Sequence, residues 1–225
     1  MNNRCNVARR AALRRVCLIS VLCGIPLRVP AARAAGSRTL LVLGDSLSAE
    51  YGLARDTGWV KLLERRLQQA QGGEQYSVVN ASISGETTSG GRTRLPALLR
   101  QHRPAIVVIE LGANDGLRGL PLATMQANLR AMIDASRAAG ARVLLVGMRI
   151  PPNYGRDYAE RFHQSFIDLA RDRKVALAPF LLDGIAEDLT LFQPDRIHPN
   201  ERAQPRLLDN VWPALAPLLA ARPAR

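Results

Sequence analysis

The sequence predicts one three-layer α/β/α domain with a five-stranded, mostly parallel sheet. Five short apolar runs rich in Val, Ile and Leu recur between residues 39 and 177, which is typical of strands buried on both faces. Apolar residues at helical spacing lie between these runs. The chain has 225 residues, 47% hydrophobic and 22% charged, which is an ordinary mix for a globular protein. Strands that alternate with helices favour a parallel sheet covered by helices.

The elements follow one another in a simple order. We expect strands at residues 39–43, 77–80, 105–111, 143–146 and 175–177. Apolar stripes with a helical period occupy residues 59–67, 125–133 and 158–169, and we interpret them as core-facing sides of helices. The last segment, residues 199–221, is expected to be a helix interrupted at Pro205, Pro213 and Pro217.

Residues 1–34 differ in charge from the rest of the chain. They hold seven Arg and no acidic residue, whereas residues 35–225 hold 24 basic and 19 acidic residues, a net charge of +5. A basic start, an apolar stretch from Val16 to Leu27 and small residues near Ala34 predict a signal peptide cleaved near Ala34, with a retained membrane anchor as the alternative. We therefore expect a periplasmic or secreted domain over residues 35–225. Its modest charge gives no reason to expect a nucleic-acid partner.

All three cysteines of the chain lie in this first segment. The expected mature domain therefore has no disulfide, no thiolate nucleophile and no cysteine-based metal site.

Polar motifs follow the expected strands at one edge of the sheet. Residues 44–48, 80–85, 112–116 and 151–155 follow the first four strands, and residues 195–199 come after the fifth. Ligands of open α/β sheets bind at the carboxyl ends of the strands, so these loops can converge on one site.

The convergent residue types suit acyl transfer. A serine such as Ser46 needs a basic partner, and His198 has Asp195 three residues before it to orient the ring. The amide of Asn114 and the backbone N–H groups of Ser46 and Gly85 can stabilise an oxyanion. Taken singly, these motifs are more often structural, and residues 114–116 in particular are typical of a turn.

The other two histidines are expected elsewhere. His102 precedes the third strand and is expected to end a helix at the opposite edge of the sheet. His163 has Glu160 three residues before it, and we interpret the two as a pair on a helix surface.

Four sequence blocks in order give the chain a family resemblance. Residues 44–48, Gly85, residues 112–115 and residues 195–198 resemble the blocks that define the SGNH hydrolase superfamily, also called GDSL lipases and esterases. The resemblance covers nearly all of residues 38–220 and implies a flavodoxin-like sandwich. Outside the blocks, the stretches at residues 79–85, 94–99, 114–119 and 152–156 make the chain most similar to the bacterial periplasmic group of multifunctional acyl-CoA thioesterases, lysophospholipases and arylesterases.

The resemblance implies roles for single residues. Ser46 would be the nucleophile, His198 the general base and Asp195 its orienting partner, with Ser46, Gly85 and Asn114 forming the oxyanion hole. It also implies substrate contacts from Gly116, Arg149, Ile150, Pro151 and Tyr154.

The implied activity is hydrolysis of acyl esters and thioesters by a secreted serine esterase of the arylesterase, thioesterase or lysophospholipase type, which needs no metal or organic cofactor. We expect a monomer that acts on small-molecule or lipid substrates and touches a membrane surface transiently. A carbohydrate O-acetyl esterase is the alternative substrate class, and an inactive flavodoxin-like binding module is the alternative of another kind. Glu50 is expected to bring negative charge near the cleft, and Pro152 to stiffen the loop at residues 150–155.

Overall fold

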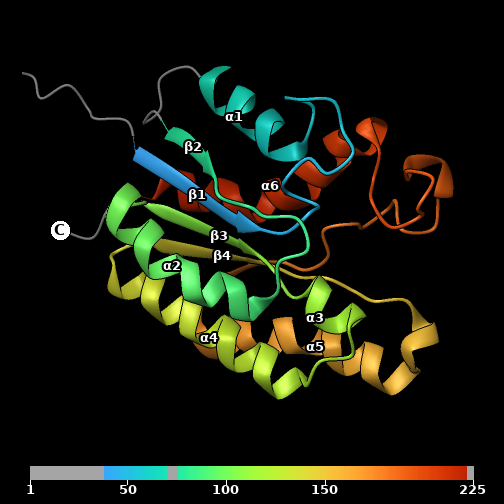
Figure 1. The fold of residues 1–225 in the computed structure, drawn as a ribbon. Coiled ribbons are helices and arrows are strands. Elements are labelled where there is room, and N and C mark those ends of the chain that lie inside the picture. The colour runs from blue at the N-terminus through green and yellow to red at the C-terminus, as the bar shows by residue number, and fades with distance from the viewer. Residues whose placement is uncertain (1–37, 70–75, 222–225) are drawn as a thin grey trace, which may run out of the picture. The chain divides into compact units, whose positions relative to one another are not determined.

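A computed structural model describes residues 38–69 and 76–221 (Figure 1). The expected signal peptide and its cleavage site near Ala34 lie outside these residues.

The sheet is parallel throughout and has the expected number of strands. Its order is β2-β1-β3-β4-β5, and each of the four neighbouring pairs is parallel. The strands are β1 (Arg38–Gly44), β2 (Tyr76–Asn80), β3 (Ile106–Glu110), β4 (Arg142–Val146) and β5 (Ala176–Ala178). This order is the flavodoxin-like one, so the predicted fold class is confirmed.

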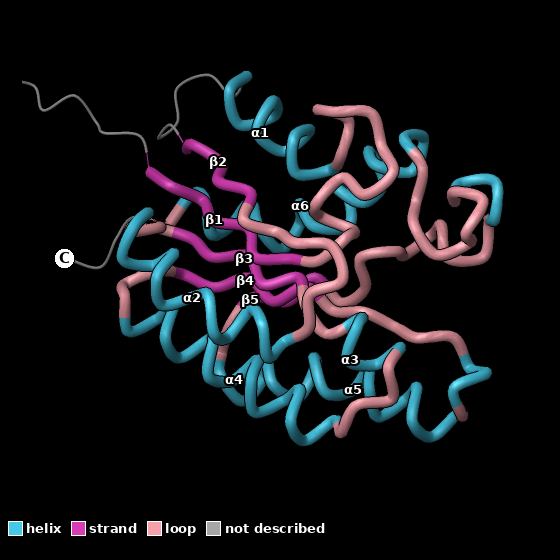
Figure 2. The backbone as a smooth tube through the Cα atoms, in the orientation of Figure 1, coloured by secondary structure: helices cyan, strands magenta, loops and turns pink. Residues whose placement is uncertain are grey.

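Helices cover both faces of the sheet (Figures 1 and 2). On one face lie α1 (Trp59–Gln69) and α6 (Gln204–Ala220), which contact each other. On the other face lie α2 (Thr88–His102), α4 (Leu122–Ala138) and α5 (Arg156–Arg173). The short helix α3 (Ala113–Leu117) follows β3, and single 3-10 turns occupy η1 (Pro152–Tyr154), η2 (Leu189–Leu191) and η3 (Glu201–Ala203).

The core lies on both sides of β1 and β3. Residues 40–43 and 106–109 have no exposed surface, which explains why these strands read as continuous apolar runs. Trp59 from α1 fills one side, and Phe162 and Phe166 from α5 fill the other. Burying side chains of this size stabilises the fold by about 1.5–3 kcal/mol each.

The C-terminal helix corrects one prediction. We expected interruptions at three prolines, but α6 is continuous through Pro213 and Pro217 and has Pro205 in its first turn. Proline is tolerated in a first turn because the missing N–H would have no helical partner there. All three prolines lie on the exposed side of α6, where water can bind the carbonyl oxygens that the inner prolines leave free.

Two further segments bear on sequence-based expectations. Residues 114–116 lie in the short helix α3, not in an isolated turn. His102 is the last residue of α2, at the end of the sheet where β3 begins, as expected. None of the described helices is long and apolar enough to cross a membrane.

The topology itself places the candidate site. The chain adds β2 on one side of β1 and then β3 on the other, so the loops after β1 and β3 diverge around a crevice at their carboxyl ends. Ligands of open α/β sheets bind at such switch points.

Candidate active site

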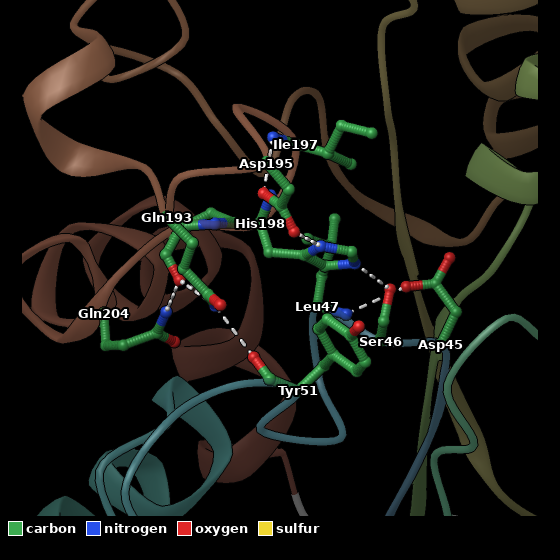
Figure 3. A network of polar contacts seen from close by, with 10 residues as sticks. Asp45, Ser46, Leu47, Tyr51, Gln193, Asp195, Ile197, His198 and Gln204 are labelled. Atoms are coloured by element: carbon green, nitrogen blue, oxygen red, sulfur yellow. Dashed lines mark hydrogen bonds and ion pairs between the residues drawn. The ribbon is translucent and has the colours of Figure 1, made fainter.

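Residues from three distant parts of the chain line one cavity at this crevice; Figure 3 shows two of these parts, the loop after β1 and the loop with His198. Ser46 follows β1, Asn114 is the second residue of α3 after β3, and His198 lies between β5 and α6. The expected convergence at the carboxyl edge is therefore what the fold produces.

Ser46, His198 and Asp195 form a continuous chain of hydrogen bonds (Figure 3). The Oγ of Ser46 lies 2.9 Å from Nε2 of His198, and Nδ1 of His198 lies 2.7 Å from Oδ2 of Asp195. The second carboxylate oxygen of Asp195 accepts the backbone N–H groups of Ile197 and His198, at 2.9 and 3.0 Å. The carboxylate is therefore fixed on three sides.

These contacts keep Asp195 ionised. Burial acts to raise the pKa of Asp195, but the backbone N–H groups of His198 and Ile197 and the ring of His198 outweigh it and lower the pKa to about 2. An ionised Asp195 accepts a hydrogen bond from the Nδ1–H group of His198, which leaves the lone pair of Nε2 directed at the serine hydroxyl.

Tyr51 and Gln193 hold the histidine loop against the serine loop. The ring of Tyr51 lies on the imidazole of His198, with centroids 4.4 Å apart. Gln193 donates its backbone N–H to the carbonyl of His198 at 2.8 Å and its side-chain amide to the carbonyl of Tyr51 at 2.8 Å (Figure 3). The contacts of Tyr51 and Gln193 therefore help to keep Nε2 of His198 within hydrogen-bonding distance of the Ser46 hydroxyl.

Of the expected oxyanion donors, Asn114 lines the same cavity as Ser46, whereas Gly85 is not among the lining residues. The Nδ2 of Asn114 donates to Oδ2 of Asp45 at 3.0 Å and to the carbonyl of Glu86 at 3.1 Å. Both of its hydrogens are occupied, so an oxyanion must share one of them. Among the hydrogen bonds of the described residues, the backbone N–H groups of Ser46 and Gly85 have no acceptor. Gly85 has a φ of 78°, and this left-handed backbone, not a lack of space, favours glycine there.

A pair of buried acids lies beneath the serine. Asp45 and Glu110 are 1% and 2% exposed, and burial raises the pKa of both. Hydrogen bonds from Leu47 and Asn114 limit the rise for Asp45, whose pKa is about 6, while the charge of Asp45 adds to the rise for Glu110. Oε2 of Glu110 accepts the hydroxyl of Ser48 at 2.6 Å. Buried carboxyl groups bonded in this way hold the loop after β1 rigidly.

A cavity of about 580 Å³ opens beside the serine and histidine. Of the expected substrate contacts, Arg149, Ile150 and Pro151 line it, whereas Gly116 and Tyr154 do not. A Cβ atom on Gly116 would lie 2.7 Å from the ring of Phe162, so this glycine serves the packing of α3 on α5. Tyr154 is 41% exposed in η1.

Several residues of the cavity wall were not anticipated individually from the sequence, although Leu47, Ala113, Arg196 and Ile197 lie in loops expected to converge. The further lining residues are mainly apolar, and they are Leu47, Ala113, Leu117, Met148, Phe180, Leu182, Ala186, Glu187, Phe192, Arg196 and Ile197, beside Asp45, Ser46, Asn114 and His198. Each lies in a loop or short helix after the carboxyl end of a strand. The rule that placed the polar motifs could therefore have indicated them too.

Two expectations about charged groups need correction. Glu50 does not line the cavity; its carboxylate accepts the N–H groups of Gly58 at 2.7 Å and Asp56 at 3.1 Å and so closes its own loop. His163 is not on a helix surface: it is 7% exposed, and its ring contacts the carbonyl of Met148 and the guanidinium of Arg149, each at 3.3 Å. The i, i+3 spacing to Glu160 was misleading because α5 turns His163 towards the end of β4.

No cluster of three or more His, Cys, Asp or Glu side chains suited to a metal ion occurs in the part of the chain that the structure describes.

Comparison with known proteins agrees with this geometry. Residues 42–205 match the GDSL-like Lipase/Acylhydrolase family. The chain is 55% identical over 185 residues to Esterase TesA of Pseudomonas aeruginosa, a match that covers 82% of this chain and 91% of that protein. It is 44% identical over 187 residues to Thioesterase 1/protease 1/lysophospholipase L1 of Escherichia coli K12, covering 83% and 88% of the two chains.

A solved structure shows the same fold. The crystal structure of TesA superposes with a TM-score of 0.78 at 54% sequence identity, covering 81% of this chain and all of that one. The matched segment includes all four sequence blocks described above. The chain therefore belongs to the GDSL-like lipase/acylhydrolase family.

Proposed function

We propose that this protein is a serine hydrolase that cleaves acyl esters and thioesters through an acyl-enzyme on Ser46. The observation that carries the proposal is the hydrogen-bonded chain from Asp195 through His198 to Ser46 at the edge of an apolar cavity. Nucleophilic catalysis by serine requires this combination of hydroxyl, base and orienting acid.

The first step forms the acyl-enzyme. Nε2 of His198 takes the hydroxyl proton of Ser46 as Oγ attacks the carbonyl carbon, and the carbonyl oxygen becomes an oxyanion. The N–H groups of Ser46 and Gly85 and the amide of Asn114 are the donors for this oxyanion. The tetrahedral intermediate collapses, and His198 returns the proton to the leaving alcohol or thiol.

The second step releases the acid. A water molecule gives its proton to Nε2 of His198 and attacks the acyl carbon, and the second tetrahedral intermediate expels Oγ of Ser46, which takes the proton back. Asp195 remains ionised in both steps and stabilises the positively charged imidazole.

The shape and lining of the cavity favour acyl groups longer than acetyl. About 580 Å³ lined by side chains such as Leu117, Ile150 and Phe180 is far more than an acetyl group fills. The names of the relatives, an esterase and a thioesterase/lysophospholipase, support the same substrate class. A carbohydrate O-acetyl esterase would be expected to have a small, polar pocket.

We further propose that residues 1–34 are a signal peptide and that residues 35–225 act as a monomeric hydrolase in the periplasm or outside the cell. The basic and apolar composition of residues 1–34 supports the first part. Lipid substrates would bring the protein into transient contact with membrane surfaces.

The test is hydrolysis of p-nitrophenyl esters from acetyl to palmitoyl by wild type and by the Ser46→Ala variant. We expect the wild type to turn over esters with a maximum above acetyl, and the variant to lose activity by at least roughly 10⁴-fold. Equal activity of both proteins would refute the role of Ser46. A maximum at acetyl would favour the acetyl-esterase alternative.

A further inference from the structure

Arg149 carries a fixed positive charge on the wall of the acyl cavity. Its guanidinium carbon lies 5.4 Å from the ring centroid of Phe180, and its Nη2 atom lies 3.3 Å from Nε2 of His163. Both Arg149 and Phe180 line the cavity. Stacking on an aromatic ring and a hydrogen bond to a second ring restrict a side chain that is otherwise long and mobile.

His163 is suited to hold this charge because it stays neutral. Burial lowers the pKa of His163, and the neighbouring positive charge of Arg149 lowers it further, against opposing effects from the Met148 carbonyl and from Glu160. A neutral ring that donates its Nδ1 hydrogen to the Met148 carbonyl presents the lone pair of Nε2 to Arg149. The buried histidine of α5 thus accepts a hydrogen bond from a cation.

The charge of Arg149 is not neutralised within the described residues, since no carboxylate there lies within 4.0 Å of it. Arg149 is itself exposed, but its guanidinium is held by Phe180 and His163. Among other charged groups of the cavity wall, Asp45 is bonded to Leu47 and Asn114. Glu187 and Arg196 are exposed as well, and neither has a side-chain partner in the described residues. Arg149 is therefore the charged group of the wall whose position is fixed while its remaining N–H donors are free for a ligand.

We propose that Arg149, positioned by His163, is a specificity-determining residue that binds a negatively charged group of the substrate, a phosphate or a carboxylate. The inference rests on the proposed function, because the bound molecule is the ester or thioester that Ser46 attacks. A guanidinium binds either anion through parallel, charge-assisted hydrogen bonds. The anion can belong to the acyl chain or to the leaving group, and the two sources require separate measurements.

The test compares charged substrates with neutral ones of equal size. Mono-p-nitrophenyl glutarate and p-nitrophenyl valerate have equal acyl length and differ in a carboxylate on the acyl side. S-butyryl-4′-phosphopantetheine and S-butyryl-pantetheine differ only in the phosphate of the leaving group. The measured quantity is the ratio of kcat/KM for the charged and neutral members of each pair, so a general loss of activity cancels.

We expect the kcat/KM of the wild type to be roughly tenfold higher for the charged member of at least one pair. A factor of this size corresponds to the weaker end of the stabilisation by a hydrogen bond between charged groups. Arg149→Gln should bring that ratio close to one, and the preference of the wild type should fall with added salt, which screens charge. Arg65→Gln is the matched control, because it removes the same charge from an exposed site on α1 outside the cavity. Its ratio should equal that of the wild type.

The role of His163 needs its own pair of variants. His163→Gln keeps an acceptor near the position of Nε2 and should retain the preference for the charged substrate. His163→Asn keeps a polar group near Nδ1 but has no acceptor within reach of Arg149, so it should lose most of the preference. If His163→Asn keeps the full kcat/KM ratio, His163 does not position Arg149. A histidine with only a structural role would leave that ratio unchanged.

The remaining outcomes separate the two proposals. Wild-type ratios near one in both pairs, ratios unchanged in Arg149→Gln, or an equal loss in Arg65→Gln would each overturn the assignment of Arg149 and leave the hydrolase intact. A wild-type protein that cleaves none of the four substrates would overturn the proposed function itself.

Discussion

Replacing Asn114 by alanine tests the oxyanion hole most directly. The side-chain amide of Asn114 lies beside the serine and donates to Asp45 at 3.0 Å and to the Glu86 carbonyl at 3.1 Å. Loss of one oxyanion donor lowers kcat by about 10²–10³. Both hydrogens of Nδ2 already bond to Asp45 and to the Glu86 carbonyl. The hydrogen bond from Nδ2 to the oxyanion is therefore shared with one of these acceptors and is weaker than an unshared one. We therefore expect a loss near the lower value, about 10², with little change in KM.

The same substitution affects stability through Asp45. The hydrogen bond from Asn114 helps to lower the pKa of Asp45, so without it that pKa rises above about 6. A buried acceptor that loses its partner costs about 1–3 kcal/mol of unfolding free energy. The loss of stability in Asn114→Ala should be larger at pH 8, where Asp45 would have to be ionised, than at pH 5, where it is mostly protonated.

The assay is steady-state hydrolysis of p-nitrophenyl butyrate together with urea unfolding at both pH values. Asn210→Ala is a matched control. Nδ2 of Asn210 likewise donates two hydrogen bonds, to the carbonyls of Leu181 at 2.9 Å and Asp183 at 2.8 Å, but Asn210 lies on α6. The control should lose stability without the hundredfold loss in kcat. If kcat of Asn114→Ala stays within threefold of wild type, Asn114 is not an oxyanion donor.

Three further predictions follow from the site and the core. Asp195→Asn should lower kcat by up to about 10⁴, because an amide favours the wrong tautomer of His198; a loss below tenfold would contradict this. In the wild type, Asp45 has a pKa of about 6 when folded and about 3.9 when unfolded, so unfolding free energy should fall as pH rises from 4 to 6. Asp45→Asn should have a smaller slope in urea titrations, with the remainder due to Glu110, whose pKa burial also raises; an identical slope would exclude Asp45 as a source. Gly147→Ala should lower the thermal midpoint by several degrees, because its Cβ would lie 2.3 Å from the Pro179 carbonyl oxygen; an unchanged midpoint would refute this packing argument.

The strands were predictable because their signal is local. A buried parallel strand must be apolar on both faces, and β1 and β3 show this over four or five successive residues. Helix α2 gave no such signal. It contains Gly90, Gly91 and Pro96, and Gly91 is required because a Cβ there would lie 2.3 Å from Leu111. That requirement comes from the close approach of α2 to the end of β3, which no helical periodicity records.

For the charged groups, too, the sequence showed some of the residues but not their partners in the fold. Glu110 interrupts an otherwise apolar strand, which was a visible sign of a buried acid, although its partners Ser48 and Asp45 depend on the fold. His163 and His198 both follow an acid at i−3, and the sequence separated them only by their place relative to the last strand. Which ring faces the serine, and which faces Arg149, depends on how α5 and the loop after β5 pack.

The sequence by itself determined the order of the strands, the edge of the sheet where polar loops gather, and the identities of Ser46, Asn114, Asp195 and His198 as candidates. These follow from local periodicity and from the rule that parallel strands end at one edge. Only the tertiary structure decided the volume and lining of the cavity and the contact between the neutral His163 and Arg149. It also decided that the carboxylate of Glu50 bonds the N–H groups of Asp56 and Gly58 in its own loop. Each of these depends on distances between side chains and backbone groups that meet only after the chain has folded.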